Sequence, residues 1–182
     1  LCMARRLNTV SDEAYQAALA GFQALPEQME AVLSRREEIR SFASQSSSRS
    51  SMFFIGRNLD YALGLEGSLK MKEISYIHAE AYASGELKHG SISLIEQDTL
   101  VVALGTYGRL FSKAVSNVVE VKARGAGVLA LTTDSRKEEM ARIADGVMTI
   151  PDADDLFLPI LGAAPLQLFA YYTALLRGCD ID

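Results

Sequence analysis

The stretch Thr99-Leu100-Val101-Val102-Ala103-Leu104 (TLVVAL) contains five successive apolar residues and ends at Gly105. A strand with one face in water alternates apolar and polar residues, whereas an unbroken apolar run is typical of a strand covered on both faces. Three other runs have this character, each followed by turn residues and a helical pattern: Met52 to Ile55, Val128 to Leu131 and Gly146 to Ile150. The segment Ile77 to Ala83 could add a fifth strand.

Short buried strands that alternate with helices predict parallel βα units joined by right-handed crossovers. The sequence therefore predicts an α/β fold, a three-layer doubly wound sandwich with a mainly parallel sheet of about five strands, preceded by N-terminal helices. Folds of this kind bind ligands at the carboxyl ends of their strands. The residues at those ends are Gly56-Arg57-Asn58, Gly105-Thr106-Tyr107-Gly108 and Thr132-Thr133-Asp134-Ser135.

Two of these strand ends allow a specific prediction. The Gly105 to Gly108 turn could offer backbone amides to a phosphate at a helix start, but it lacks a lysine or a cluster of hydroxyls. Ser135 and Glu138 have the spacing of a capping box, which favours a structural role for that end.

The N-terminal third of the chain is predicted to be helical. Asp12 to Phe42 has helical spacing of apolar residues, and Pro26 could begin a second helix, which predicts a helical hairpin or a bent pair. The serine-rich connection SFASQSSSRSS follows, and serine side chains compete for backbone hydrogen bonds. We expect a boundary there, with a helical segment at 1–44 and the α/β domain at 45–182. The opening LCMARRLN has no start methionine, so we expect a fragment of a longer chain.

Composition excludes several classes of partner. The 182 residues carry a formal net charge of −5 and the sequence pI is about 5.1, so we expect neither a nucleic-acid surface nor an anionic membrane surface. The two cysteines, Cys2 and Cys179, lie at opposite ends of the chain, which suits a reducing cytosol better than a disulfide scaffold. The apolar run Leu156 to Leu176 contains two prolines and Gln167, so we expect a buried core helix and no membrane span.

The segment LEGSLKMKE places charges inside a predicted helix. Glu66, Lys70 and Glu73 are separated by four and then three residues, so their side chains rise in one column. The bland interpretation is an exposed ion-pair ladder. We expect the apolar neighbours to face the core and the small neighbours to let another backbone or a ligand approach. The apolar set is Ala62, Leu65, Leu69 and Tyr76, and the small set is Gly64, Gly67 and Ser68.

Both histidines lie in the next segment, ISYIHAEAYASGELKHGSISL, where Gly85 and Gly90 permit unusual backbone conformations. His78-Ala79-Glu80 is similar to the start of a zinc deaminase motif, but no CxxC follows, so we expect no metal site. A capping or core role suits His78. For His89 a loop-stabilising role and an acid/base role both stay open.

A carboxylate, an amine and an imidazole can together isomerise a sugar without a cofactor. The carboxylate removes a proton next to a carbonyl, the lysine stabilises the developing oxyanion, and the imidazole moves a proton to or from the ring oxygen. These steps match aldose-ketose isomerisation.

The block LEGSLKMKEISYIHAEAYASGELKHG resembles the second sugar-isomerase (SIS) domain of the isomerizing glutamine:fructose-6-phosphate amidotransferases, also called glucosamine-6-phosphate synthases. The resemblance covers nearly the whole chain, through the further segments ALPEQME, FFIGR, VKARGAGVLALTTD and PILGAAPLQLFAYYTALLRGCDID. It implies a cytoplasmic dimer that makes glucosamine 6-phosphate from fructose 6-phosphate and glutamine, with no cofactor. Its partners within the parent chain would be a glutaminase domain and a first isomerase domain. Residues 1–44 would be the helical segment that joins the first isomerase domain to this one.

The resemblance also implies roles for the singled-out residues. Glu73 would be the base that moves a proton between C1 and C2 of the sugar phosphate. Lys70 would contact substrate beside it, with Glu66 as a further neighbour. His89 would be the ring-opening acid/base, delivered across the dimer interface into the partner's site.

Two departures and three missing parts qualify this expectation. Ser91 stands where the family usually has proline, and Asn58 where it often has glycine. The phosphate-holding loops belong to the first isomerase domain, the glutaminase domain is absent, and the Schiff-base lysine would lie beyond Asp182. We therefore expect the fragment to be inactive alone.

Two alternatives remain. One is a stand-alone phosphosugar isomerase or deaminase that lacks a glutaminase, and the other is a sugar-phosphate-sensing module without catalysis. Retention of Glu73, Lys70 and His89 speaks against a sensor, which needs affinity but no carbon-acid base.

Overall fold

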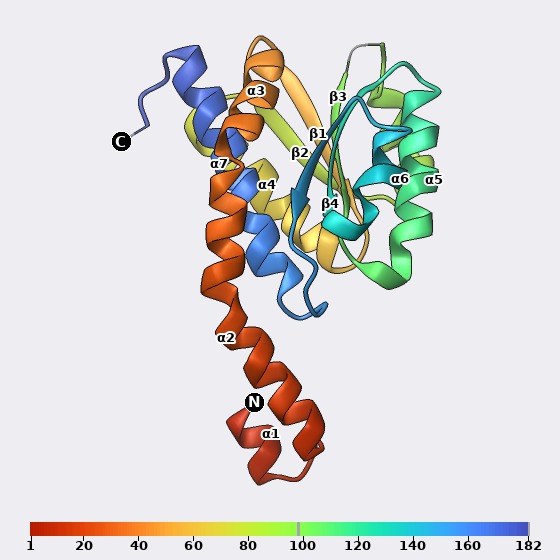
Figure 1. Cartoon of the computed structure of the whole chain (residues 1–182). Helices are drawn as coiled ribbons and strands as arrows, with labels where there is room; N and C mark the ends of the chain where they lie inside the picture. The colour runs from red at the N-terminus through yellow and green to blue at the C-terminus, as the bar shows by residue number, and fades with distance from the viewer. Residues whose placement is uncertain (98, 182) are drawn as a thin grey trace.

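The computed structural model describes residues 1–97 and 99–181. Its centre is a five-stranded sheet in the order β2-β1-β3-β4-β5, and every neighbouring pair is parallel. The strands are β1 (Ser51–Gly56), β2 (His78–Ala83), β3 (Leu100–Gly105), β4 (Gly127–Thr133) and β5 (Gly146–Ile150). All four apolar runs form strands, and the segment that could add a fifth strand forms β2. The predicted doubly wound fold is confirmed (Figure 1).

The burial of the strands explains their sequences. Every residue of β3 is buried, because β3 lies in the middle of the sheet with helices over both faces. β2 is an edge strand and only partly buried, which accounts for its mixed sequence HAEAYA. The chain reverses its direction of winding between β1 and β3, so the loops after these two strands diverge there.

Helices cover the sheet in two layers (Figure 1). One face carries α4 (Leu59–Ser75) and α7 (Leu158–Arg177), together with α3 (Arg36–Ser46) and the end of α2 (Asp12–Ser34). The other face carries α5 (Phe111–Lys122) and α6 (Lys137–Ala141). The remaining helices are short: α1 (Cys2–Arg6), η1 (Leu87–His89), η2 (Ser91–Leu94), η3 (Gly108–Leu110) and η4 (Asp134–Arg136).

The long apolar helix α7 belongs to the core. Phe169 and Leu161 are fully buried in it, and it packs against α3 and α4. Among the described residues, α7 is the one helix that is long and apolar enough to cross a membrane. Half of its most apolar stretch is buried within the protein. The burial follows from its position, because the helix covers β-strands that would otherwise expose apolar side chains.

The N-terminal helices differ from the prediction in two ways. Pro26 lies inside α2, and the break comes at Arg35, so the second helix does not start at Pro26. Of the two predicted arrangements, the bent pair forms and the hairpin does not (Figure 1). The serine-rich connection also begins as helix: α3 continues to Ser46, and the hydroxyls of Ser44 and Ser46 donate to carbonyls three and four residues back. Packing overrides the weak helix propensity, because α3 buries Ile39 and Ala43 in the core. The division at residues 44 and 45 stays a prediction.

Candidate functional site

The turn after β3 already holds an anion, and that anion is a side chain of the protein. Asp60 is 3% exposed, and its Oδ2 accepts hydrogen bonds from the backbone N–H of Thr106 at 3.0 Å and of Tyr107 at 3.2 Å. Its Oδ1 accepts from the Thr106 hydroxyl at 2.5 Å. Burial raises the pKa of Asp60, while these bonds and the nearby Arg136 guanidinium oppose the rise. Two of the backbone amides in the turn predicted to bind a phosphate are therefore occupied by Asp60.

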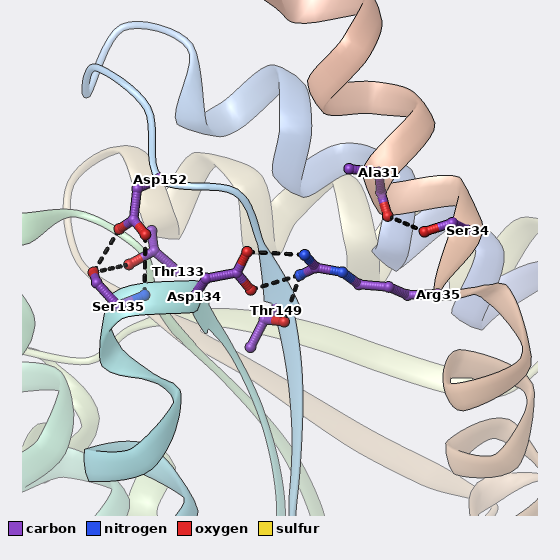
Figure 2. A network of polar contacts seen from close by, with 8 residues as sticks. All are labelled: Ala31, Ser34, Arg35, Thr133, Asp134, Ser135, Thr149 and Asp152. Atoms are coloured by element: carbon purple, nitrogen blue, oxygen red, sulfur yellow. Dashed lines mark hydrogen bonds and ion pairs between the residues drawn. The ribbon is translucent and has the colours of Figure 1, made fainter.

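The strand ends after β4 and β5 are also closed by internal contacts (Figure 2). From the α2–α3 junction, Arg35 donates to both carboxylate oxygens of Asp134, at 2.6 and 2.8 Å, and to the Thr149 hydroxyl at 2.6 Å. Beside this pair, Asp152 accepts from the N–H and the hydroxyl of Ser135. The predicted capping box is wrong, because the Ser135 side chain bonds to Asp152 and α6 has no side-chain cap.

The turn after β1 contains a residue, Asn58, with a positive φ angle. Asn58 has φ 55° and ψ −120°, a region that suits glycine and strains other residues. This agrees with the family's frequent glycine there. The neighbouring Arg57 is held by Asn117 of α5, with its Nε 3.1 Å from the Asn117 Oδ1. All three strand ends singled out by the sequence are thus joined to other parts of the fold.

The charged column on α4 is different, because it lies on the outer surface. The Lys70 Nζ is 2.7 Å from the Glu73 Oε2, and the two side chains are 34% and 47% exposed. The Glu66 Oε1 accepts a hydrogen bond from Gln167 Nε2 of α7 at 3.1 Å. The ion pair with Glu73 raises the pKa of Lys70, chiefly through its hydrogen bond, and the Glu66 charge adds to the effect. The structure thus brings the three predicted side chains onto one face.

The apolar residues beside the column do not face the core, so that prediction is wrong. Leu65, Leu69 and Tyr76 are 47%, 43% and 65% exposed, and Ala62 is exposed as well. The buried face of α4 is made by Leu63, Gly64, Gly67, Ser68, Met71 and Ser75. The helical pattern misled because small residues, not leucines, mark the tightly packed side.

The two buried glycines of α4 are small for packing within the chain. A Cβ on Gly67 would lie 2.8 Å from Phe54 Cε1 and 2.9 Å from Leu166 Cδ1. A Cβ on Gly64 would lie 3.2 Å from Leu104 Cδ1. The close neighbours are therefore β1, β3 and α7, and the predicted approach of a ligand to these glycines is wrong.

The structure does not bring His89 to the column. His89 follows β2 in η1, and its side chain is 74% exposed and 3.9 Å from the Glu86 carboxylate. The adjacent Lys88 pairs with Glu120 of α5, and Leu87 is buried in the α5-side core. Glu73 belongs to α4 on the opposite face of the sheet. Within one chain, His89 and Glu73 lie on opposite sides of the sheet.

His78 is also accounted for by a local contact. Its Nε2 is 3.4 Å from Glu80, which also accepts a hydrogen bond from the Tyr82 hydroxyl, and the His78 side chain is 64% exposed. The predicted core or capping role is therefore wrong for His78. Across residues 1–97 and 99–181, no group of three or more His, Cys, Asp or Glu side chains is arranged to hold a metal ion.

Comparison with known proteins agrees with the resemblance in the sequence. The glutamine–fructose-6-phosphate aminotransferase (isomerizing) of Clostridium acetobutylicum is 47% identical over 182 residues, which is all of this chain and 30% of that protein. The enzyme of the same name from Thermococcus kodakarensis is 42% identical over 180 residues, or 29% of its length. The chain thus spans about 30% of the length of the curated relatives it matches.

Solved structures give the same result. The C-terminal domain of glucosamine-fructose-6-phosphate aminotransferase from Francisella tularensis matches all of this chain with a TM-score of 0.93 and 34% identity, and the match covers 51% of that structure. Glucosamine-6-phosphate deaminase from Thermotoga maritima shares the fold, with a TM-score of 0.66 and 24% identity. The family model described as the SIS domain matches residues 46–177, most of the chain, and the chain therefore belongs to the SIS domain family.

Proposed function

We propose that the chain is the carboxyl-terminal isomerase domain of a cytoplasmic amidotransferase that makes glucosamine 6-phosphate from fructose 6-phosphate and glutamine. The observation that carries the proposal is the Lys70–Glu73 ion pair, 2.7 Å long, on an outer face of α4. The pair adds little to stability, because solvent screens the attraction between two partly exposed side chains. A charged pair with so small a structural effect is available for chemistry.

Glu73 and Lys70 suit the proton transfer of this reaction. Once the ring is open, ammonia condenses with the C2 carbonyl and releases water, which leaves an imine. The Glu73 carboxylate takes a proton from C1 and returns it at C2, while the C1 hydroxyl proton passes to the nitrogen, so the product has an aldehyde at C1 and an amine at C2. Lys70 carries its charge throughout the neutral range, since Glu73 and Glu66 raise its pKa. Its ammonium can therefore stabilise negative charge that develops on the sugar oxygen during the transfer.

The proposed site needs groups from other parts of the assembly. Glu73 and His89 lie on opposite faces of the sheet, which supports a homodimer in which each His89 serves the partner's site. The exposed Leu65 and Leu69 beside the column support a further contact with the first isomerase domain, which would supply the phosphate-binding loops. In this proposal residues 1–44 lead from that domain, and the fragment alone is inactive.

The test uses the full-length protein and measures glucosamine 6-phosphate formed from fructose 6-phosphate, with glutamine and separately with ammonia. We expect glutamine to support synthesis and Glu73→Gln to lose a factor of about 10² or more, because a positioned base is removed. Glu37→Gln is the matched control, since Glu37 makes a comparable exposed ion pair with Arg40 on α3.

Other outcomes select other functions. Wild-type activity in Glu73→Gln would make the column a solvated ladder and sink the proposed site. Isomerisation or deamination without any use of glutamine would favour a stand-alone phosphosugar isomerase or deaminase. Binding of sugar phosphate without turnover in the full-length protein would indicate a sensor.

A further inference from the structure

Gln167 is the only amide side chain in α7, and it points away from the core. Thr173, six residues later in the same helix, is buried and donates to the Phe169 carbonyl of its own helix. Gln167 is exposed and instead donates from Nε2 to the Glu66 Oε1 on α4, at 3.1 Å. It therefore joins the helix that carries the column to a helix that the proposed chemistry does not otherwise use.

Close packing of the two helices puts Gln167 in this position. Leu166 lies over Gly67, whose missing Cβ would be 2.9 Å from Leu166 Cδ1. At a second crossing, a Cβ on Gly162 would lie 2.6 Å from Leu63 Cδ2. The residues next to the first contact, Gln167 and Glu66, are consequently brought side by side at the surface. Their register is determined by buried atoms and does not depend on the hydrogen bond.

From Glu66 the interaction reaches the column through charge alone. Lys70 lies one turn further along α4, the Glu66 charge makes a small addition to its raised pKa, and its hydrogen bond goes to the Glu73 carboxylate at 2.7 Å. A carboxylate accepts more than one hydrogen bond, so Gln167 can hold one oxygen of Glu66 and leave the other directed along the helix. Glutamine suits this task because its amide donates without adding a charge to the site.

We infer that Gln167 is a positioning residue for the sugar-isomerase site, which acts by holding the Glu66 carboxylate toward Lys70. The inference rests on the proposed function of the column. Outer contacts that orient groups in contact with a ligand commonly change activity by a factor of ten or more when they are removed.

The experiment uses three variants of the full-length protein and the glucosamine 6-phosphate assay. Gln167→Met keeps the length and the helix propensity of the side chain but removes the donor. Gln167→Glu keeps the shape and faces Glu66 with a second carboxylate. Gln28→Met is the matched control, because Gln28 on α2 makes a similar bond of 3.2 Å to the Asp152 carbonyl, far from α4 in the chain.

We expect kcat in Gln167→Met to fall about tenfold with little change in KM, since the orientation of Lys70 matters most in the transition state. Gln28→Met should keep wild-type kcat. In Gln167→Glu the loss should be at least as large as in Gln167→Met, because two ionised carboxylates repel each other and no donor remains. In a Glu66→Met background, Gln167→Met should cause no further loss.

Three results would overturn the inference. The first is a kcat in Gln167→Met equal to that of Gln28→Met. The second is an equal loss with and without the Glu66 carboxylate, and the third is a wild-type kcat in Gln167→Glu. Failure of the proposed function has a separate signature: Glu73→Gln would then keep its activity, whereas failure of this inference alone leaves Glu73→Gln inactive and Gln167→Met active.

Discussion

The polar residues at the carboxyl ends of the strands and the charged column on α4 have opposite properties. At the strand ends, Asp60 is buried and has three hydrogen-bond donors, and Arg35 makes a paired contact with Asp134. On α4, Lys70 and Glu73 are partly exposed and bond to each other. General experience with doubly wound folds places ligands at strand ends. In this chain those residues join parts of the fold, and the groups suited to chemistry lie on the outside of a helix.

The largest expected effect is the loss of activity in two single variants and its partial recovery when the two variant chains form mixed dimers. We expect Glu73→Gln and His89→Asn chains each to be inactive as full-length homodimers. Random mixing of the two should restore about a quarter of wild-type activity, because half of the dimers are mixed and one of their two sites keeps both groups. The glucosamine 6-phosphate assay measures the recovery. A mixture with no activity would mean that both groups act in one chain.

Removal of the buried carboxylate should have the largest effect on stability. Asp60→Ala leaves the N–H groups of Thr106 and Tyr107 without their acceptor, and we expect a loss of about 2 to 4 kcal/mol of unfolding free energy in urea. Asp60→Asn is the control for charge. A loss below about 0.5 kcal/mol in Asp60→Ala would show that the strand end tolerates an open anion position.

The pH dependence of Asp60 has a definite sign. Its pKa is raised in the folded protein, so the folded state binds the proton more tightly than the unfolded state does. The stability of the wild type relative to Asp60→Asn should therefore be greatest below the unfolded pKa of about 4 and should decline as the pH rises through the raised value. Urea unfolding at several pH values from 4 to 7 measures this difference, and an advantage that grows with pH would contradict the assignment.

A methyl group at the α4–α7 contact should have the next largest effect. Gly67→Ala places a Cβ 2.8 Å from Phe54 and 2.9 Å from Leu166, so we expect a net loss of about 1 to 2 kcal/mol despite the better helix propensity of alanine. Gly127→Ala is the matched control, because a Cβ there meets nothing within 4 Å. Thermal unfolding compares the two, and an unchanged melting temperature in Gly67→Ala would show that the helices can separate easily.

The smallest effect is expected at the Arg35–Asp134 pair of Figure 2. Arg35 holds the pKa of Asp134 below its usual value, so the pair stabilises the fold above pH 4 and loses its effect as the pH falls through the lowered pKa. Asp134 is 40% exposed, and solvent screening limits the loss in Arg35→Met to about 1 kcal/mol at pH 7. Arg40→Met, in the more exposed pair with Glu37, should be neutral. A loss in Arg35→Met that is unchanged at pH 2.5 would show that packing alone is responsible.

The sequence by itself predicted the sheet and the helix face that the three side chains of the column share. TLVVAL and the three similar runs favoured strands covered on both faces, so a mainly parallel, doubly wound sheet followed from local pattern and crossover handedness, whereas the order of its strands did not. The spacing of Glu66, Lys70 and Glu73 placed them on one helix face before any fold was known.

Tertiary structure decided which polar groups remain available and which face of α4 is buried. Asp60 reaches the β3 turn across 46 residues, and Arg35 reaches Asp134 across 99, so no local pattern could show that these groups are occupied. The helix period predicted a core role for Leu65 and Leu69, but the face that carries Gly64 and Gly67 is buried instead, because these glycines let side chains of β1, β3 and α7 come close. The separation of His89 from Glu73 likewise follows from the sheet between them, which forms only when all five strands have paired.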